Sequence, residues 1–507
     1  MLDGLSQAAH FQGQYALAIS LKERAFAAYR RRGERAGAAE VARWLAFLHG
    51  MVHGNMAAAS GWMARAERLL EGADECAAHG WLTLDRAPFT RDPIERERLA
   101  GAALAIARRF GDVDLEFDAL ALLGEACVVS GRVGEGMRLL DEAMAAIAGG
   151  EVVGVGAIGD IYCRFLSACE HATDVRRAEQ WIWAAERLVA WSDFVGPTCR
   201  CHYGGILVAV GRWAEAEGEL LAALRAFEGG YRAERISPLV RLAELRLRQG
   251  RFEEAERLLE GSEWHPTARR SLAAIALARG DYALAGDLAR ICVEGGVPSD
   301  PASAPPLDLL LDVQVARGDL LGARETLDRL SALADTSGDG RVDASCAFAT
   351  GRILAAEGNE QASLHLRVAL ERFSALDLPL EAGRARLALA RSLASRSAAA
   401  ALAEARLALA AFDGLGATRD ADAAAALLRE LGSTGRVRAK GHGPLTRRET
   451  DVLLLLAAGL SNAEIGARLV ISRRTAEHHV AMILSKLDVR NRSEAAAYAV
   501  REVLQDP

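Results

Sequence analysis

The chain has 507 residues, with 61 basic and 68 acidic side chains and a formal net charge of −7. Hydrophobic residues make up 51% of it and aromatic residues only 6%, which suits closely packed helices rather than sheets. The longest apolar run, 452–460, is too short to span a bilayer, and no secretory signal stands at the N-terminus. Eight cysteines without regular spacing fit reduced thiols. We therefore expect a cytoplasmic protein that contacts no membrane.

Six short segments in the first two thirds of the chain share the pattern Gly-x-apolar-x-x-Ala. Three of their start-to-start distances are 41, 39 and 38 residues, and one is 30. We expect each glycine to end a helix and the apolar residue two places on to begin the next. The alanine lets the paired helices approach closely. The glycines are Gly13, Gly54, Gly211, Gly250, Gly280 and Gly318, and degenerate copies lie near Asp92, Gly131, Asp174, Gly358 and Ser397.

This period is typical of helical hairpins stacked into a solenoid. The array resembles tetratricopeptide repeats, with the period stretched from 34 residues toward 40. The alternative is one irregular helical domain. The glycine-rich segment 149–156 follows a helix rather than a strand, so we expect a loop between repeats and not a nucleotide-binding turn.

Two clusters within the array invite a functional interpretation. Cys199-Arg200-Cys201-His202 places two thiols and an imidazole within four residues, but its spacing is cramped for zinc. The ordinary alternative is buried cysteines on a helix face, and we predict no metal site. The tryptophans Trp181, Trp183 and Trp191 could line a ligand groove, but packing inside the hairpin is the interpretation we favour.

The C-terminal part carries the signals of several short helices after a glycine-rich, basic linker at 432–444. Thr446 with Glu449, and Ser461 with Glu464, have the spacing of capping boxes. Gly459 is placed to end the first of these helices. Two further N-caps are expected at Ser472 and Ser493.

The helix expected from Arg473 to about Leu487 has two different faces. One face is an apolar stripe for the domain core, made of Ala476, Val480, Ile483 and Leu487. The opposite face is small, polar and partly basic, as a helix entering the major groove requires. It consists of Arg474, His478, Ala481 and Ser485, with Glu477 beside them.

The segments 445–449, 459–465 and 472–480 resemble the LuxR-type helix-turn-helix. The resemblance implies a four-helix domain whose third helix contacts DNA and whose fourth pairs two subunits. The implied base-facing residues are Glu477, His478 and Ala481. The other implied DNA-contacting residues are Arg473, Arg474, Thr475, His479 and Lys486. The implied dimerisation residues are Ala496, Tyr498 and Val503.

Long arrays of this kind precede LuxR-type domains in the large maltose-regulator-like bacterial activators, which begin with a nucleotide-binding domain. This chain has only three lysines, Lys22, Lys440 and Lys486. None of them stands in the G-x-x-x-x-G-K-[ST] arrangement that holds phosphate. We therefore expect no ATPase domain of that type and no cofactor.

The basic charge is concentrated beside the predicted helix-turn-helix. Residues 436–507 hold 12 basic and 8 acidic side chains, a net of +4, whereas the rest of the chain has a net of −11. Such a distribution favours attraction to DNA phosphates. The alternative is a structural helical bundle whose basic residues form a solvated face.

The sequence thus predicts an all-α protein in three parts: a tetratricopeptide-like α-solenoid at 1–431, the linker 432–444 and a four-helix LuxR-type domain at 445–507. The predicted function is transcriptional regulation without enzymatic activity. The expected partners are double-stranded DNA, a second copy of the chain on that DNA, and a small-molecule or protein effector at the repeats. The alternative is an interaction scaffold that does not bind DNA.

Overall fold

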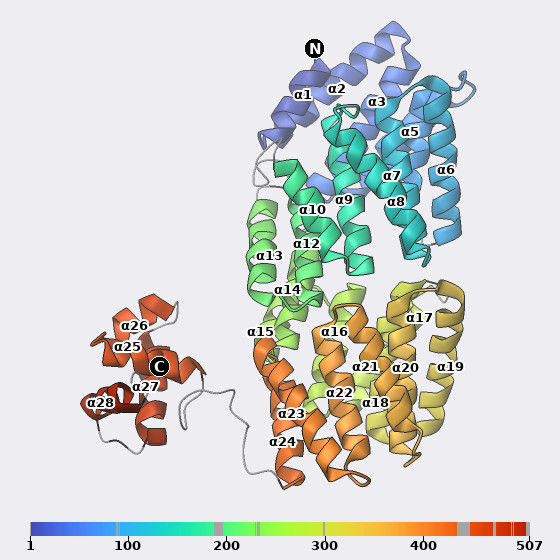
Figure 1. Ribbon diagram of the computed structural model, residues 1–507. Coiled ribbons are helices and arrows are strands. Elements are labelled where there is room, and N and C mark those ends of the chain that lie inside the picture. The colour runs from blue at the N-terminus through green and yellow to red at the C-terminus, as the bar shows by residue number, and fades with distance from the viewer. Residues whose placement is uncertain are drawn as a thin grey trace. The chain divides into compact units, whose positions relative to one another are not determined.

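The computed structural model describes residues 2–87, 90, 92–186, 196–228, 230, 234–297, 300–432, 447–469, 473–487, 489 and 491–502. The chain divides into two compact units, 1–424 and 425–507. Over the described residues all regular structure is helical (Figure 1), which confirms the predicted fold class. No helix in the described ranges is long and apolar enough to cross a membrane.

The first unit is built from the following helices: α1 (Leu2–Phe11), α2 (Tyr15–Arg32), α3 (Arg35–Phe47), η1 (Leu48–Val52), α4 (Met56–Leu70), α5 (Ala77–Arg86), α6 (Pro93–Phe110), α7 (Val113–Val129), α8 (Val133–Ala148), α9 (Val155–Ala172), α10 (Val175–Glu186), α12 (Pro197–Ala209), α13 (Trp213–Phe227), α14 (Ile236–Arg248), α15 (Phe252–Leu259), α16 (Pro266–Arg279), α17 (Tyr282–Glu294), η3 (Pro301–Ser303), α18 (Ala304–Arg317), α19 (Leu320–Ser337), α20 (Gly340–Ala356), α21 (Ala362–Ala375), α22 (Pro379–Leu393) and α23 (Ala398–Leu415). Helix α24 (Thr418–Glu430) begins in the first unit and ends in the second.

The predicted repeat pattern marks the helix ends correctly. All six glycines have φ between 69° and 83°, the left-handed conformation that ends a helix without a steric cost to glycine. The apolar residue two places after each glycine is the first residue of a helix, namely of α2, α4, α13, α15, α17 and α19. The alanines of the pattern are all buried. The segment 149–154 is a loop between α8 and α9, whereas the last two residues of the expected loop 149–156 already begin α9.

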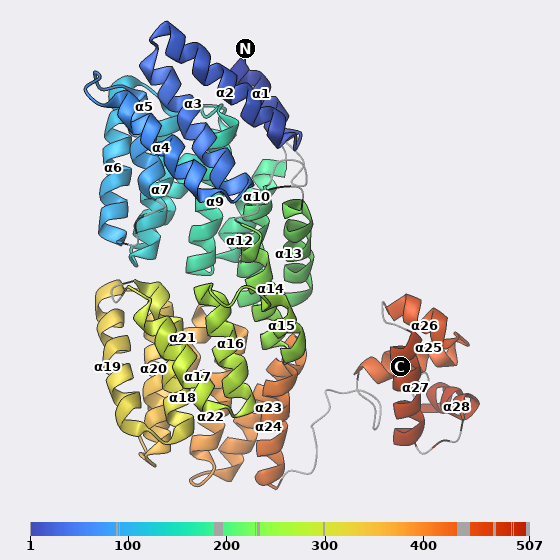
Figure 2. The same cartoon turned by 180° about the vertical axis from the view of Figure 1, so that it is seen from behind.

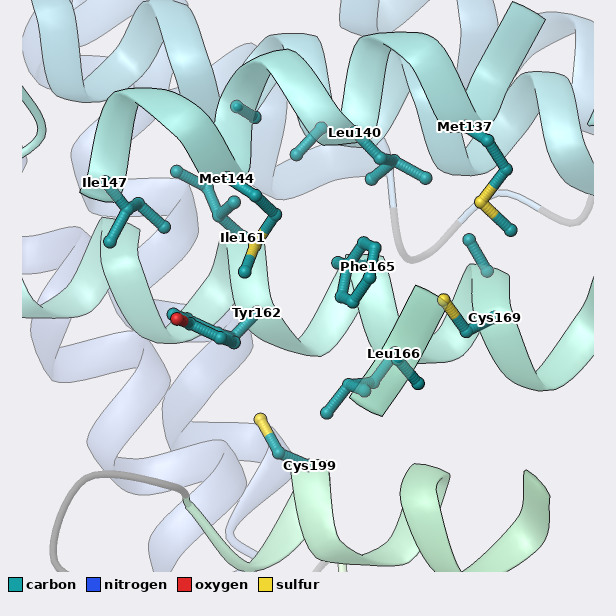
Figure 3. Packing of buried hydrophobic residues seen from close by; sticks show 14 of the residues in the cluster. Met137, Leu140, Met144, Ile147, Ile161, Tyr162, Phe165, Leu166, Cys169 and Cys199 are labelled. Atoms are coloured by element: carbon teal, nitrogen blue, oxygen red, sulfur yellow. The ribbon is translucent and has the colours of Figure 1, made fainter. Parts of the chain in front are cut away.

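Each hairpin packs its first helix against its second, and the first helices also pack against one another. Helices α3, α5, α7, α9, α12, α14, α16, α18, α20 and α22 thereby form a continuous layer, which we call the first-helix row (Figures 1 and 2). Figure 3 shows the packing near its middle, where Ile161 and Phe165 of α9 lie against Met144 and Leu140 of α8. Burial of these side chains is the main stabilising contribution, since each contributes about 1.5–3 kcal/mol.

Two stretches of the array that are far apart in sequence contact each other. His171 Nε2, at the end of α9, lies 3.0 Å from Oδ2 of Asp339, the N-cap residue of α20. Arg248 Nη1 on α14 donates to Glu381 Oε1 on α22 at 3.0 Å. The solenoid therefore turns back on itself, so that α20 and α22 lie beside α9 and α14. Repeat periodicity alone does not predict this closure, because it reports only on neighbouring hairpins.

Candidate DNA-binding domain

The second unit contains four further helices with a hydrophobic core of their own: α25 (Arg447–Ala457), α26 (Asn462–Leu469), α27 (Arg473–Leu487) and α28 (Arg492–Glu502). The predicted apolar stripe of α27 faces this core. Ala476 and Ile483 are fully buried, Val480 is buried and Leu487 packs partly buried against the cluster. Because one stripe of α27 is occupied by the core, the opposite face of the helix points away from it.

The turn before α27 follows the predicted local signals. Gly459, at φ +84°, ends α25. The backbone amide of Ser461 donates to Glu464 Oε2 at 2.7 Å, and the amide of Glu464 donates to Ser461 Oγ at 3.3 Å. This reciprocal pair is the predicted capping box, and it satisfies two amides that the first turn of α26 leaves without a helical partner.

The predicted cap of the last helix is wrong. Helix α28 begins at Arg492, so Ser493 lies inside its first turn. Asn491 is the capping residue: its Oδ1 accepts from the Glu494 amide at 3.0 Å and its Nδ2 donates to Glu494 Oε1 at 3.0 Å. The signal was present in the sequence, because Asn491 has an acidic residue three places on and Ser493 does not.

An ion pair inside the domain joins α25 to α27. Lys486 Nζ donates to Oε1 and Oε2 of Glu449 at 2.5 and 2.7 Å, with 7% of the glutamate side chain and 27% of the lysine side chain exposed. Glu449 was expected to cap α25 together with Thr446, which lies outside the described residues. The cap therefore stays a prediction, and the structure shows that both carboxylate oxygens also accept from Lys486. Sequence reasoning missed this pair because its members are 37 positions apart.

Arg492 is a second residue that the sequence patterns did not reveal. Its guanidinium donates to the carbonyl oxygen of Leu460 and, at 3.3 Å, to Oδ1 of Asn462. It thereby ties the start of α28 to the turn between α25 and α26, the turn that sets the direction of α26. An isolated arginine at a helix start carries no distinctive sequence signal, so only the packing of the domain identifies its role.

The structure places the predicted DNA-contacting residues on one helix, α27. The side chains of Arg473, Arg474, Thr475, Glu477, His478 and Ala481 lie outside the described residues, so only their position on the helix is established. The side chain of His479 is half-buried. Lys486 is engaged by Glu449, and its contact with DNA stays a prediction.

The predicted dimerisation residues lie on or after α28. Ala496 is half-buried, and Tyr498 is half-buried against the core cluster of the domain. Part of the tyrosine ring therefore already packs within its own subunit. Val503 lies outside the described residues.

The Cys-x-Cys-His segment of α12 sends its side chains to different surroundings. Cys199 Sγ lies 3.4 Å from Cys163 Sγ. Figure 3 shows Cys199 beside Tyr162. Cys201 is buried beside Ala223 and Phe227, and His202 Nδ1 lies 2.7 Å from Glu170 Oε2. Within the ranges that the structure describes, no three His, Cys, Asp or Glu side chains are arranged to hold a metal ion.

The three tryptophans also do not form one group. Trp181 packs against the core cluster around Phe165 and donates through Nε1 to Asp141 Oδ1 at 2.9 Å, which confirms the packing interpretation for this residue. Trp183 is 63% exposed, so the expectation that it packs inside the hairpin is wrong. It stands two positions from Trp181 on a helix, and such positions face different sides. Trp191 lies outside the described residues.

The C-terminal domain is similar to bacterial regulators. The family described as bacterial regulatory proteins, luxR family, matches residues 443–499. The chain is 49% identical over 63 residues to the transcriptional regulatory protein LiaR of Bacillus subtilis, covering 12% of this chain and 30% of that protein. It is 40% identical over 80 residues to the response regulator protein VraR of Staphylococcus saprophyticus, covering 16% of this chain and 38% of that protein. The chain thus spans less than two fifths of the length of these relatives.

Two solved structures resemble the chain over most of its length. Yeast Tom70 covers 78% of this chain and 96% of its own, with a TM-score of 0.36 and 12% identity. The match to the Cut9–Hcn1 hetero-tetramer of APC/C covers 83% of this chain and 95% of the matched chain, with a TM-score of 0.37 and 12% identity. At these scores the likeness adds nothing to the architecture described above. The match of the family to the four-helix unit is what identifies it: the C-terminal domain of this chain is a LuxR-type helix-turn-helix domain.

Proposed function

We propose that the chain is a DNA-binding transcriptional regulator of the cytoplasm, in which the repeat array senses a small molecule or partner protein and controls the C-terminal domain. The observation that carries the proposal is the match of the luxR family to residues 443–499, together with the four helices and separate core found there. The net charge of +4 over 436–507, against −11 for the rest of the chain, supports attraction to phosphates at that end.

Within the domain, we assign base contacts to Glu477, His478 and Ala481. Phosphate contacts are assigned to Arg473, Arg474 and their neighbours on α27. Both assignments rest on the family resemblance and on the placement of these residues along α27. A glutamate there would accept a hydrogen bond from the N4 amino group of cytosine. An arginine beside the DNA backbone would bind phosphates equally well in any DNA sequence.

We propose that two chains bind one DNA site through the last helix. The proposal rests on the resemblance, which assigns pairing to Ala496, Tyr498 and Val503, and on the usual match between a two-fold protein and two DNA half-sites. We place the functional boundaries at 431 and 445, because α24 ends at Glu430 and α25 begins at Arg447.

The proposed function predicts salt-dependent DNA binding by the isolated fragment 432–507. DNA is first selected from a random pool, and affinity is then measured by fluorescence anisotropy. We expect affinity to fall at least about tenfold between roughly 50 and 200 mM salt, because bound counterions are released from the phosphates. The complex should sediment as two fragments on one duplex.

The matched control is the repeat region 1–431, whose net charge of −11 predicts no DNA binding. Circular dichroism establishes that the fragment is folded in the same buffer. A folded fragment without salt-dependent binding would contradict the proposal and favour the interaction scaffold. A DNA complex with one fragment at full affinity would contradict only the dimer.

The assignment of base contacts predicts a change of sequence preference in Glu477→Ala. We expect one position per half-site to lose its preferred base, at a cost of about 1–3 kcal/mol on the best site. Arg474→Ala is the contrast, since loss of a phosphate contact should weaken all sites alike and reduce the salt slope by about one. Binding-site selection with both variants separates the two effects. An unchanged preference in Glu477→Ala would remove this residue from the base-contacting set.

A further inference from the structure

A polar cavity lies within the repeat unit, where the solenoid turns back on itself. Its volume is about 310 Å³, and a second cavity of about 490 Å³ shares Glu170, Arg241, Glu244 and Arg270 with it. Both volumes lie in the range of small-molecule sites. We call the first of them the arginine cavity, because four arginines line it: Arg241, Arg248, Arg270 and Arg341.

The walls of the arginine cavity come from two separate stretches of chain. Helices α9, α12, α14 and α16 provide one wall, and α18, α20 and α22 provide the other. The side-chain contact between His171 and Asp339 and the ion pair between Arg248 and Glu381 join these walls. A molecule that touches both walls would therefore stabilise the closed arrangement of the solenoid.

Two of the four arginines are fully engaged in holding the structure together. Arg241 donates to both oxygens of Glu170, at 3.0 and 2.8 Å. Burial opposes ionisation of Glu170, but Arg241 and His202 outweigh it and lower the pKa of that carboxyl to about 2. Arg248 bonds to Glu381 at 3.0 Å and to Glu244 at 3.2 Å. The guanidinium groups of Arg241 and Arg248 are therefore paired with carboxylates of the protein itself.

The other two arginines, one on each wall, are poorly matched. Among the described residues, the ion pair of Arg270 on α16 is with Glu244 at 3.5 Å, and Arg248 already shares that carboxylate. The Asp308 carboxyl also interacts electrostatically with Arg270. Arg341 on α20 donates to the carbonyl oxygen of His171 at 3.4 Å and forms no ion pair within the described ranges. Since a guanidinium carries five N–H groups, both residues keep donors available to a ligand.

A carboxyl group also lines the cavity, near Arg270. Asp308 on α18 lies beside the Ser345 hydroxyl, and burial raises the pKa of the Asp308 carboxyl to about 6. A carboxyl in this state both accepts and, when protonated, donates hydrogen bonds. It suits a hydroxyl group on a ligand better than it suits a second anion.

We propose that the arginine cavity binds a small molecule with a carboxylate or phosphate group, whose oxyanion engages Arg270 from one wall and Arg341 from the other. Planar guanidiniums match the paired oxygens of both groups. This inference rests on the proposed function, because it identifies the chemical class of the effector and its place in the repeat region. A volume of about 310 Å³ suits a small molecule rather than a protein segment.

The test is calorimetric titration of the full chain with citrate, inorganic pyrophosphate and glycerol at matched ionic strength. We expect citrate or pyrophosphate to bind with a Kd below about 1 mM, and glycerol not to bind. Binding of citrate alone or pyrophosphate alone assigns the oxyanion as carboxylate or phosphate. If neither anion binds, the inference is overturned.

The variant Arg270→Gln/Arg341→Gln should bind the anion about 10- to 100-fold more weakly, as expected for lost charge-assisted hydrogen bonds. Arg290→Gln is the control, since Arg290 is 58% exposed on α17, pairs with Asp287 and lies outside the cavity. It should bind like the wild type. Equal affinity of the double variant and the wild type would overturn the assignment of the two arginines.

Asp308→Asn keeps the experiment decisive if the double variant does not fold. It removes a negative charge from the cavity and should tighten anion binding severalfold, whereas unchanged or weaker binding would count against the inference. DNA binding by the wild-type chain is measured separately. If DNA binds and the anions do not, the cavity inference fails alone; if the anions bind and DNA does not, the proposed regulator fails.

Discussion

Lys486→Met is expected to destabilise the DNA-binding domain by about 3 kcal/mol, because it removes the ammonium from which both oxygens of the buried Glu449 carboxylate accept. Glu449→Met should cost less, about 1–2 kcal/mol, since the lysine side chain is 27% exposed and can turn its ammonium toward water. Urea unfolding of the fragment 432–507, followed by circular dichroism, measures both values.

The double variant Glu449→Met/Lys486→Met should recover to within about 1 kcal/mol of the wild type, because two apolar side chains replace the ion pair. Glu464→Gln is the control: it removes a carboxylate from the same domain but keeps an oxygen that can accept from the Ser461 amide. If Lys486 acted only on phosphates, Lys486→Met would lower DNA affinity and leave the unfolding midpoint unchanged. That outcome would contradict the structural role of the pair.

Gly131→Ala is expected to destabilise the repeat array by about 3 kcal/mol or more. Gly131 has φ +84° in the turn between α7 and α8, and an added Cβ would lie 1.3 Å from the carbonyl oxygen of Ser337. Because that neighbour is backbone at the end of α19, relief requires the two turns to separate. The midpoint of thermal unfolding of the full chain measures the effect.

The control for this substitution is Gly318→Ala. Gly318 has φ +75° in the equivalent turn between α18 and α19, but an added Cβ would meet nothing within 4 Å. It should cost only the strain of a left-handed alanine, about 1–2 kcal/mol. Equal effects of the two substitutions would show that the turn at Gly131 does not press against Ser337, and would argue against closure of the solenoid there.

The local features of both units could be predicted because short segments decide them. A glycine that adopts positive φ ends a helix wherever it stands, as Gly211 and Gly280 do, so the hairpin ends followed from sequence. The capping box of Ser461 and Glu464 and the buried stripe through Ala476 and Ile483 followed in the same way. The prediction was wrong where two neighbouring residues could both cap a helix. Ser493 was expected to cap the last helix, but Asn491 does so.

Other features depend on residues that meet only after the chain has folded. Repeat periodicity describes how a hairpin packs on its neighbour, but not that Asp339 reaches His171 across 168 positions. The sequence likewise does not reveal that Lys486 pairs with Glu449. Taken separately, Lys486 suggested a DNA contact and Glu449 suggested a helix cap. Cys199 and Cys201 looked like one cluster in sequence, yet positions two apart on a helix face different sides, so Cys199 lies beside Cys163 and Cys201 packs against Ala223 and Phe227.

The sequence by itself determined that this chain is an array of helical hairpins followed by a LuxR-type helix-turn-helix domain, because helix ends, helix faces and the family motif are all encoded within a few dozen residues. Only the tertiary structure decided that the array closes on itself and that Arg270 and Arg341 line one cavity. The physical reason is that closure sums many small contacts between surfaces distant in sequence, and no local pattern records which surfaces will meet.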